Sequence, residues 1–199
     1  MEVLEFRKIR KADNFNKKYL AWSRIYEYPL VLENITRYMN EEVVNIHNSS
    51  WGFTGCHITF KDDLDNLYSK CVHSDIKPSL LSNTEVWDIT KKPKNEWKNN
   101  FDVVINVSTW KNNFVINVST LEEVDFDHIE IFNNLLAQVR DNGLLICTFD
   151  LPGLDLERFE ELFGREIKSF DDDLTNSNST LPAFVSTRHL ECGIMVIRK

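Results

Sequence analysis

Short apolar runs separate longer segments of mixed polarity along most of the chain. Runs with the length of strands occur at residues 42–47, 71–75, 84–88, 101–107, 144–149 and 193–199. The run LLICTF at 144–149 is apolar throughout, as expected of a central parallel strand that is covered on both faces. Helical spacing of apolar residues predicts helices over residues 56–70, 126–139 and 154–163. This alternation predicts an α/β fold of three layers around a largely parallel sheet.

The boundaries of the domain follow from the same pattern. Residues 1–40 are expected to form an amino-terminal helical segment, in which Pro29 separates two runs of helical spacing. Residues 41–199 are expected to form the α/β domain, and the whole chain one compact unit. Asn142 and Gly143 are expected to end the helix over 126–139, because a left-handed conformation is tolerated there.

One string of residues occurs twice. Residues 97–109 are WKNNFDVVINVST, and residues 110–120 are WKNNFVINVST, so 110–120 is a tandem duplication of 97–109 with two residues missing. A sheet position accepts one strand, so one copy is surplus, inserted either before or after the strand. Two antiparallel strands are the least favoured arrangement, because the following helix would then start from the wrong end of the sheet. We favour the first copy as the strand, since it retains Asp102.

The charge balance of the chain indicates which classes of partner it is not expected to bind. The 199 residues include 31 acidic and 23 basic side chains, which gives a net charge of −8. Nucleic acids and anionic membranes are bound by clustered Lys and Arg, so we expect neither partner. Residues 1–18 are too charged for a signal peptide, and no apolar stretch approaches the about 20 residues of a spanning helix. We therefore expect a cytoplasmic protein.

The residue types that bind metals are scattered. Cysteines without a CxxC pair are expected to be reduced core residues, and they are Cys56, Cys71, Cys147 and Cys192. The histidines at 57, 73 and 189 are isolated and lack the spacing of a zinc set. The acidic segment 171–180 is expected to be an exposed loop with solvated charges. We predict no metal site.

Ligands of an open parallel sheet bind beyond the carboxyl ends of its strands. The predicted strands place residues 45–55, Asp75, Asp88 with Ile89, and residues 106–109 there. A carboxylate after the second strand suits both hydroxyls of a ribose, and one after the third suits an exocyclic amine such as that of adenine. Either aspartate alone can equally cap the next turn or helix. Together, at successive strand ends, they favour a nucleoside-like ligand.

Several segments carry motifs of a known family. Without the second copy, residues 101–124 give FDVVINVSTLEEV, and residues 133–150 are NNLLAQVRDNGLLICTFD. The first resembles the FDxVhxxxxLEHV signature, and the second the LLRPGGxLxIxxP signature, of class I S-adenosylmethionine-dependent methyltransferases. Residues 186–199 are similar to the final antiparallel strand of that family, and residues 26–35 to the segment before its first strand. The resemblance implies a Rossmann-like methyltransferase fold, with S-adenosylmethionine as cofactor.

The chain differs from that family at the glycine-rich motif. An acid and a GxGxG-like loop normally follow the first strand, whereas residues 43–55 here are VVNIHNSSWGFTG. Asn45 stands in place of the acid, and His47 and Ser49 stand at expected glycines. A packed, hydrogen-bonded loop histidine is the commoner role for a residue such as His47. The cofactor site implied by the resemblance comprises Asn45, His47, Ser49, Gly52, Asp75 for the ribose, Asp88 and Ile89 for the adenine, and Asn106.

Methyl transfer asks mainly for alignment, because the sulfonium is a strong electrophile and a base is needed only when the acceptor loses a proton. No catalytic residue stands out among the candidate bases, which are Glu122, Glu123, His128 and His47. The resemblance and the charge together imply a small-molecule or sugar acceptor. One alternative is a methyltransferase-like domain that has lost its cofactor and serves as a binding or scaffolding module, which the missing glycines favour. Another is a nucleotide-sugar or dinucleotide enzyme, which the absent GxGxxG weakens.

Overall fold

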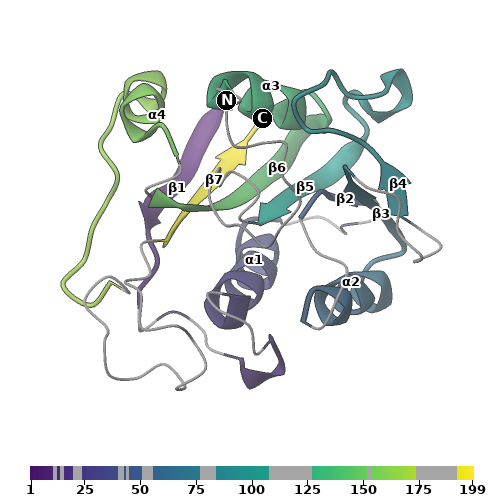
Figure 1. Cartoon of the computed structure of the whole chain (residues 1–199), viewed down its shortest axis with the longest axis horizontal. Helices are drawn as coiled ribbons and strands as arrows, with labels where there is room; N and C mark the ends of the chain where they lie inside the picture. Colours follow the sequence, from purple (N-terminus) through teal and green to yellow (C-terminus); the bar gives the residue numbers. More distant parts are fainter. Residues whose placement is uncertain are drawn as a thin grey trace, which may run out of the picture.

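One sheet between two layers of helices forms the protein (Figure 1). The computed structural model describes residues 1–10, 13, 16–19, 24–39, 43, 45–50, 56–76, 84–107, 127–151, 154–173 and 192–199. The strands are β1 (Glu2–Lys8), β2 (Asn45–Asn48), β3 (Lys70–Asp75), β4 (Thr84–Val86), β5 (Phe101–Val107), β6 (Val139–Asp150) and β7 (Cys192–Arg198). The helices are η1 (Lys17–Tyr19), α1 (Arg24–Tyr38), α2 (Cys56–Leu67), η2 (Asn95–Trp97), α3 (His128–Leu136) and α4 (Leu156–Phe163).

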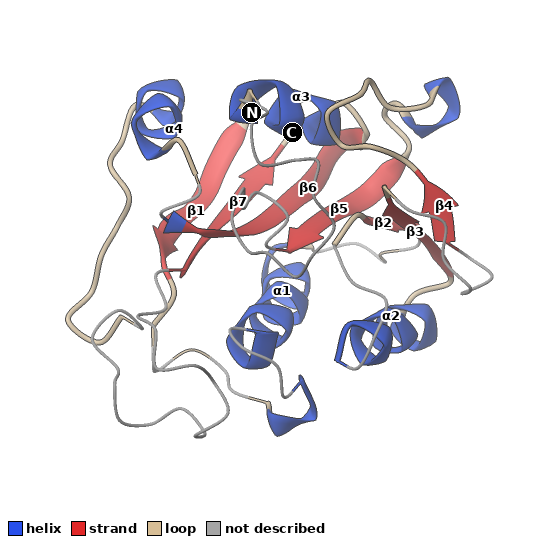
Figure 2. Ribbon diagram, viewed as in Figure 1, coloured by secondary structure: helices blue, strands red, loops and turns tan. Residues whose placement is uncertain are grey.

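The sheet is mostly parallel, with strand order β1-β7-β6-β5-β2-β3-β4. Each neighbouring pair from β6 to β4 is parallel, whereas β7 is antiparallel to both β6 and β1. Parallel neighbours need crossover connections, and the helices lie over the sheet accordingly. Helices α1 and α2 lie on one face, and α3 and α4 lie on the other (Figure 2). This confirms the predicted three-layer α/β fold with an antiparallel carboxyl-terminal strand.

Each face of the sheet has its own hydrophobic core. In β5, Val103 and Ile105 belong to the core beneath α1 and α2, while Val104 belongs to the core beneath α3 and α4. In β6, Ile146 and Leu145 divide between the two cores in the same way. Alternate side chains of a strand point to opposite faces, so a strand covered on both faces is apolar along its whole length.

The first copy of the duplicated string forms the central strand, as predicted. It is β5, which pairs in parallel with β2 on one side and with β6 on the other. One oxygen of Asp102 accepts the backbone N–H of Asn45 at 2.7 Å, and the other pairs with Arg140. The second copy has no aspartate at this place, so it cannot supply either contact. That copy lies outside the described residues.

The prediction of helices throughout residues 1–40 is wrong at its start. Glu2–Lys8 forms strand β1, which extends the sheet by antiparallel pairing with β7. Helices η1 and α1 do follow within residues 1–40, but Pro29 lies inside α1 and does not divide it. A proline has no N–H for the carbonyl of Ile25, and this carbonyl instead accepts the N–H of Asn16 at 3.0 Å. The helix can therefore continue through the proline.

The predicted helix stop at Asn142 and Gly143 is also wrong. Helix α3 ends at Leu136 and β6 begins at Val139, so both residues lie inside a strand. Asn142 does adopt a left-handed conformation, with a φ of 64°. A Cβ on Gly143 would lie 2.7 Å from the carbonyl oxygen of Asp102. Close packing against β5, rather than a helix end, requires the glycine.

The acidic segment 171–180 is not wholly solvated, contrary to prediction. Asp173 is buried and forms an antiparallel bridge with Arg10. Asp171 is exposed, as expected, and residues 174–180 lie outside the described part of the chain. The third aspartate thus connects the residues that follow β1 with the segment after α4.

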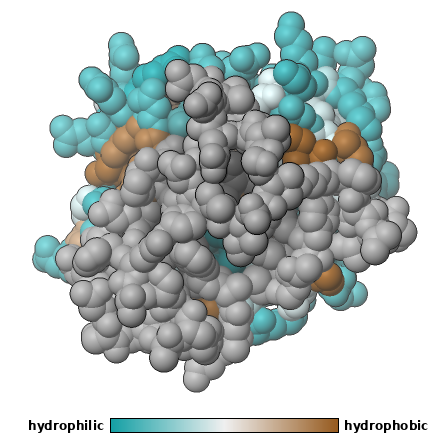
Figure 3. Space-filling model, viewed as in Figure 1, coloured by the Kyte–Doolittle hydropathy of each residue, from teal (hydrophilic) through white to brown (hydrophobic). Residues whose placement is uncertain are grey.

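The described surface is mainly hydrophilic in the view of Figure 3. Large apolar side chains that are exposed are Met1, Leu67, Ile76, Val86 and Leu162. Within the described ranges, every helix is too short or too polar to span a membrane.

Candidate functional site

The carboxyl ends of β2, β3 and β5 meet at one edge of the sheet. The register pairs Asn48, the last residue of β2, with His73 on β3 and with Ile105 on β5, so β3 and β5 both extend two residues beyond the end of β2. Asp75 ends β3, and Asn106 is the penultimate residue of β5. Ligands of parallel sheets bind at this edge. It is therefore the candidate site, and we call it the carboxyl edge.

The turn after β2 is tied to β5 by its side chains. The Ser49 hydroxyl donates to the carbonyl of Ile105 at 3.1 Å, and the Asn106 amide donates to the Ser49 hydroxyl at 3.1 Å. The Ser50 hydroxyl accepts the N–H of Val107 at 3.0 Å. All three polar side chains are buried. Two residues predicted for the site, Ser49 and Asn106, are thus in direct contact, and they extend the β2–β5 contact beyond the end of β2.

Asp75 is buried at the end of β3, with 6% of its surface exposed. The ammonium group of Lys61, on α2, is also buried, and burial lowers the pKa of Lys61. The carboxylates of Asp75 and Asp65 act in the opposite direction and raise it. The carboxyl edge therefore holds an acceptor of hydrogen bonds at the position predicted for the ribose.

Asp88 and Ile89 lie in the turn after β4. One oxygen of Asp88 accepts both the backbone N–H of Thr90 at 2.9 Å and its hydroxyl at 2.8 Å. The carbonyl of Ile89 accepts the side-chain amide of Asn134, on α3, at 3.2 Å. An aspartate that bonds to the N–H two residues later stabilises a turn. The turn-capping role that the sequence left open for Asp88 is present in the structure.

His47 lies inside β2 and is fully buried on the α3 side of the sheet. Its Nδ1 is 2.6 Å from Oε1 of Gln138, and its Nε2 is 2.7 Å from the hydroxyl of Ser74. Since Oε1 can only accept, Nδ1 carries the proton and Nε2 accepts from the serine. The ring centroids of Trp97 and Phe101 lie 4.5 and 5.1 Å away. Burial lowers the pKa of His47 to about 3, so it is a neutral, packed side chain.

Asn45 lies at the opposite end of β2 from the carboxyl edge. Its backbone N–H binds Asp102, and its side-chain amide donates to the carbonyl of Asn100 at 2.9 Å. Asp102 lies at the beginning of β5, and Asn100 directly precedes this strand. The structure therefore does not bring Asn45 together with Asp75 and Asn106, because the start of a parallel strand lies at the other edge of the sheet.

His73 and its partners were not among the predicted site residues. Its Nδ1 is 3.2 Å from the amide nitrogen of Asn48, and its Nε2 is 3.0 Å from a carboxylate oxygen of Asp65, on α2. The side-chain oxygen Oδ1 of Asn48 accepts the backbone N–H of Ser50 at 3.1 Å. A histidine within an otherwise buried strand was the available signal. Its partners depend on the β2–β3 register, which the sequence does not reveal.

Of the remaining candidate residues, the structure describes only His128. His128, at the start of α3, accepts the backbone N–H of Asp155 at 3.0 Å, and burial lowers its pKa. It thereby links the first turns of α3 and α4. The residues Gly52, Glu122 and Glu123 lie outside the described ranges.

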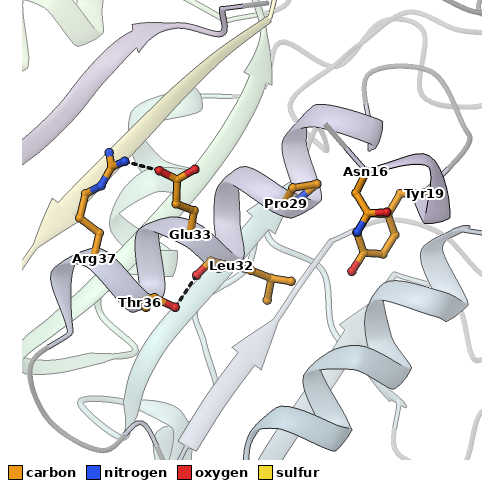
Figure 4. Close-up of a pocket in the computed structure, with 7 residues that line it drawn as sticks. All are labelled: Asn16, Tyr19, Pro29, Leu32, Glu33, Thr36 and Arg37. Carbon is orange, nitrogen blue, oxygen red and sulfur yellow. Dashed lines mark hydrogen bonds and ion pairs between the residues drawn. The ribbon is translucent and has the colours of Figure 1, made fainter. Parts of the chain in front are cut away.

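A hollow of about 610 Å³ runs along the outer side of α1 (Figure 4). Its charged side chains, Glu33 and Arg37, form an ion pair, and the Thr36 hydroxyl donates to the carbonyl of Leu32 at 3.1 Å. These groups bind one another, and none of them comes from a strand end. We therefore keep the carboxyl edge as the candidate site. The residues that line the hollow are Asn16, Tyr19, Pro29, Leu32, Glu33, Thr36 and Arg37.

No family model and no curated protein matches the chain. Among solved structures, a TehB-like SAM-dependent methyltransferase from Corynebacterium glutamicum is 11% identical, with a TM-score of 0.50, over 83% of this chain and 86% of that one. The CurJ carbon methyltransferase is 10% identical, with a TM-score of 0.46, over 86% of this chain and 52% of that one. The CMeT domain of the citrinin polyketide synthase is 12% identical, with a TM-score of 0.44, over 85% of this chain and 50% of that one.

The chain thus spans about half the length of the last two structures. At these identities the likeness concerns the fold. Together with the strand order and the antiparallel β7, it gives the chain the Rossmann-like fold of class I methyltransferases. The same fold hosts different activities, so function has to be argued from the site.

Proposed function

We propose that the protein is an S-adenosylmethionine-dependent methyltransferase whose cofactor binds at the carboxyl edge of the sheet. The observation that carries the proposal is the buried carboxylate of Asp75 at the end of β3. Its two oxygens are acceptors that fit the two hydroxyls of a ribose. Burial strengthens such hydrogen bonds, since water competes for them less. The fold supports the proposal, because its sheet presents the strand ends at one edge.

The described residues fit the nucleoside half of the cofactor. Asp75 would hold the ribose, and the turn of Asp88 and Ile89 would lie beside the adenine, where the Ile89 side chain supplies apolar surface. Asn106 and Ser49 would approach the methionine end through the turn after β2. When bound, the cofactor supplies an electrophilic methyl group. The protein then has to align an acceptor and exclude water, and a base is needed only for an acceptor that loses a proton.

The proposed acceptor is a small molecule or a sugar. The net charge of −8 disfavours a polyanionic acceptor, since nucleic acids are held mainly by lysine and arginine at their phosphates.

Isothermal titration calorimetry of the full chain tests the proposal, with S-adenosylmethionine and S-adenosylhomocysteine as ligands. We expect binding that weakens by at least about tenfold in Asp75→Ala, since a buried acceptor of two hydrogen bonds is lost. Asp141→Ala is a matched control, because Asp141 is exposed and belongs to the part of β6 before its pairing with the end of β5. Absence of heat at millimolar ligand, or equal affinity in Asp75→Ala, would overturn the proposal.

One observation favours a second function, a methyltransferase-like binding module without cofactor. The side chain of Ser49 bonds to β5 at a position where the family has a glycine, whose missing side chain lets the backbone approach a ligand. A protein that binds neither ligand in calorimetry, yet keeps its fold, would support this second function.

A further inference from the structure

A chain of hydrogen bonds leads from the surface of α2 to the turn after β2. The backbone N–H of Ser50 can only donate. The atom of the Asn48 side-chain amide that faces it at 3.1 Å is therefore the oxygen Oδ1. The amide NH₂ of Asn48 then faces Nδ1 of His73, which must accept. The proton of a neutral His73 therefore lies on Nε2 and points to the carboxylate of Asp65. Each donor in the chain meets an acceptor.

Three of these residues are enclosed, and the fourth is not. Asn48 and His73 have no exposed surface, and Ser50 has 2%. The Asp65 side chain, in contrast, is 37% exposed. Protons can therefore reach the chain at one end, while the other end holds the backbone of the turn.

We propose that His73 is a positioning residue for the turn after β2, and that protonation of His73 releases the backbone of this turn at Ser50 through reversal of the Asn48 amide. The proposal rests on the proposed function, in which this turn borders the cofactor. In the neutral state His73 holds the Asn48 amide, and Asn48 holds Ser50. His73 itself contacts no ligand.

The reversal follows from the count of donors. A protonated His73 carries a hydrogen on Nδ1, which would face the NH₂ group of Asn48 as a second donor. Rotation of the amide by half a turn presents the Asn48 oxygen to Nδ1. The NH₂ group then faces the N–H of Ser50, and that hydrogen bond is lost. The turn keeps the bonds of Ser49 to Ile105 and Asn106 and the bond of the Ser50 hydroxyl to the N–H of Val107, while the backbone N–H of Ser50 loses its acceptor.

The charges around His73 determine the pH at which the Asn48 amide reverses. Burial lowers its pKa, while Asp65 and Asp62, both on α2, oppose this effect. Lys61, also on α2, disfavours the proton. On β2 the neighbouring titratable group is His47, which lies on the other face of the sheet. On its own strand, Asp75 follows two residues later, and the paired residue of β4 is the uncharged Thr84. The reversal is therefore expected on the acidic side of neutrality.

A pH titration of the ligand-free, ¹⁵N-labelled full chain by NMR tests the proposal. We expect the backbone amide of Ser50 to shift with the midpoint at which the ring nitrogens of His73 titrate. In His73→Gln, which offers one acceptor and one donor but no titration, the Ser50 shift should disappear. In Asp65→Asn the midpoint should move to lower pH, since a negative charge beside the imidazolium is removed. A Ser50 amide that does not follow His73 would overturn the proposal.

Asp63→Asn is the matched control for Asp65→Asn. Asp63 is on the same helix but pairs with Lys18 and Tyr19, so its change should leave the midpoint unchanged. The Asp65 variant alters an exposed side chain, and it tests the proposal even if a change at the buried His73 prevents folding.

Calorimetry with S-adenosylhomocysteine adds the functional readout. We expect the affinity to fall by about tenfold below the midpoint, which corresponds to one lost hydrogen bond in the turn. His73→Phe should show that loss at every pH, and His73→Gln should restore affinity without pH dependence. A Ser50 transition in a chain that binds no ligand would contradict the proposed function and support the positioning role. Binding that is independent of pH across the midpoint would contradict the role of His73.

Discussion

Two buried histidines on neighbouring strands, His47 and His73, have opposite surroundings. Both use both ring nitrogens in hydrogen bonds, and both have no exposed surface. His47 faces α3, and its partners are the neutral side chains of Gln138 and Ser74 within a ring of aromatic residues. His73 faces α2, and one of its partners is the exposed carboxylate of Asp65.

Because of this difference, His47 stays neutral and fixed, whereas His73 can take up a proton. A buried imidazole between neutral partners cannot become charged without a large loss of solvation, which explains the pKa of about 3 for His47. A carboxylate at one nitrogen supplies both a counter-charge and a route to solvent. The same residue type therefore fastens the sheet to α3 on one face and connects the turn after β2 to the surface on the other.

Removal of the His47 ring should have the largest effect on stability. His47→Ala leaves a cavity among Trp97 and Phe101 and two buried polar groups without their partner, on Gln138 and Ser74. We expect the free energy of unfolding to fall by about 4 kcal/mol in urea denaturation. His73→Ala should cost less, because water can enter from the side of Asp65. Equal losses in the two variants would contradict the contrast between the faces.

Acid should destabilise the protein mainly through His47. An unfolded histidine titrates near its usual pKa of about 6.5, whereas folded His47 takes up a proton only near about 3. The unfolded state thus binds more protons between these values, and stability falls as the pH is lowered through this window. We expect a loss of about 2 kcal/mol from pH 6.5 to pH 5.

Urea denaturation at a series of pH values measures this dependence. His47→Gln should flatten the curve, because glutamine does not titrate. A wild-type stability that stays constant from neutral pH to pH 5 would show that His47 is not the buried neutral group described above. His73 contributes in the same direction, since burial lowers its pKa as well.

The hydroxyl of Ser74 should have an intermediate effect. Ser74→Ala removes the donor to Nε2 of His47 and leaves a buried acceptor, so we expect a loss of about 1 to 2 kcal/mol in the free energy of unfolding. Ser69→Ala is a matched control on the exposed residue before β3, with an expected change within about 0.5 kcal/mol. A result in which both serines behave alike would place the Ser74 hydroxyl outside the His47 network.

The smallest effect on stability is expected for the partner of His73. Asp65→Asn keeps an oxygen acceptor at an exposed position, so thermal or urea denaturation at pH 7 should change by less than about 1 kcal/mol. A loss comparable to that of Ser74→Ala would mean that the carboxylate is a structural anchor and not a solvent-facing end of the chain of hydrogen bonds.

The central strands could be predicted from the sequence because their own composition determines them. The runs at β3, β5 and β7 are found within one residue of their predicted bounds, although β3 and β5 also contain buried polar residues such as His73 and Asn106. Strand β1 could not be predicted in this way, because it contains Glu5 and Arg7. Both charges are buried, and they are balanced by Asp13 and Arg37 as well as by each other. A local sequence window does not contain these partners.

The same distinction applies to the carboxyl edge. The position of Asp75 at a strand end could be predicted, because it depends only on where the local strand-like run CVHSD stops. The bond between His73 and Asn48 depends on the register of β2 against β3, and register is a property of two strands and not of either alone. The place of Asn45 could not be predicted. The strand is expected over residues 42–47, whereas β2 begins at Asn45, so this residue lies at the end of β2 away from the carboxyl edge.

The aspartate at the start of β5 has a consequence for folding kinetics. Two segments of the unfolded chain offer nearly the same apolar string to β2 and β6, and capture of either one is a long-range event that must precede completion of the sheet. Asp102 distinguishes them, because only the first copy can bind the Asn45 N–H and Arg140. A single carboxylate thus favours the first copy over the second as the partner of β2 and β6.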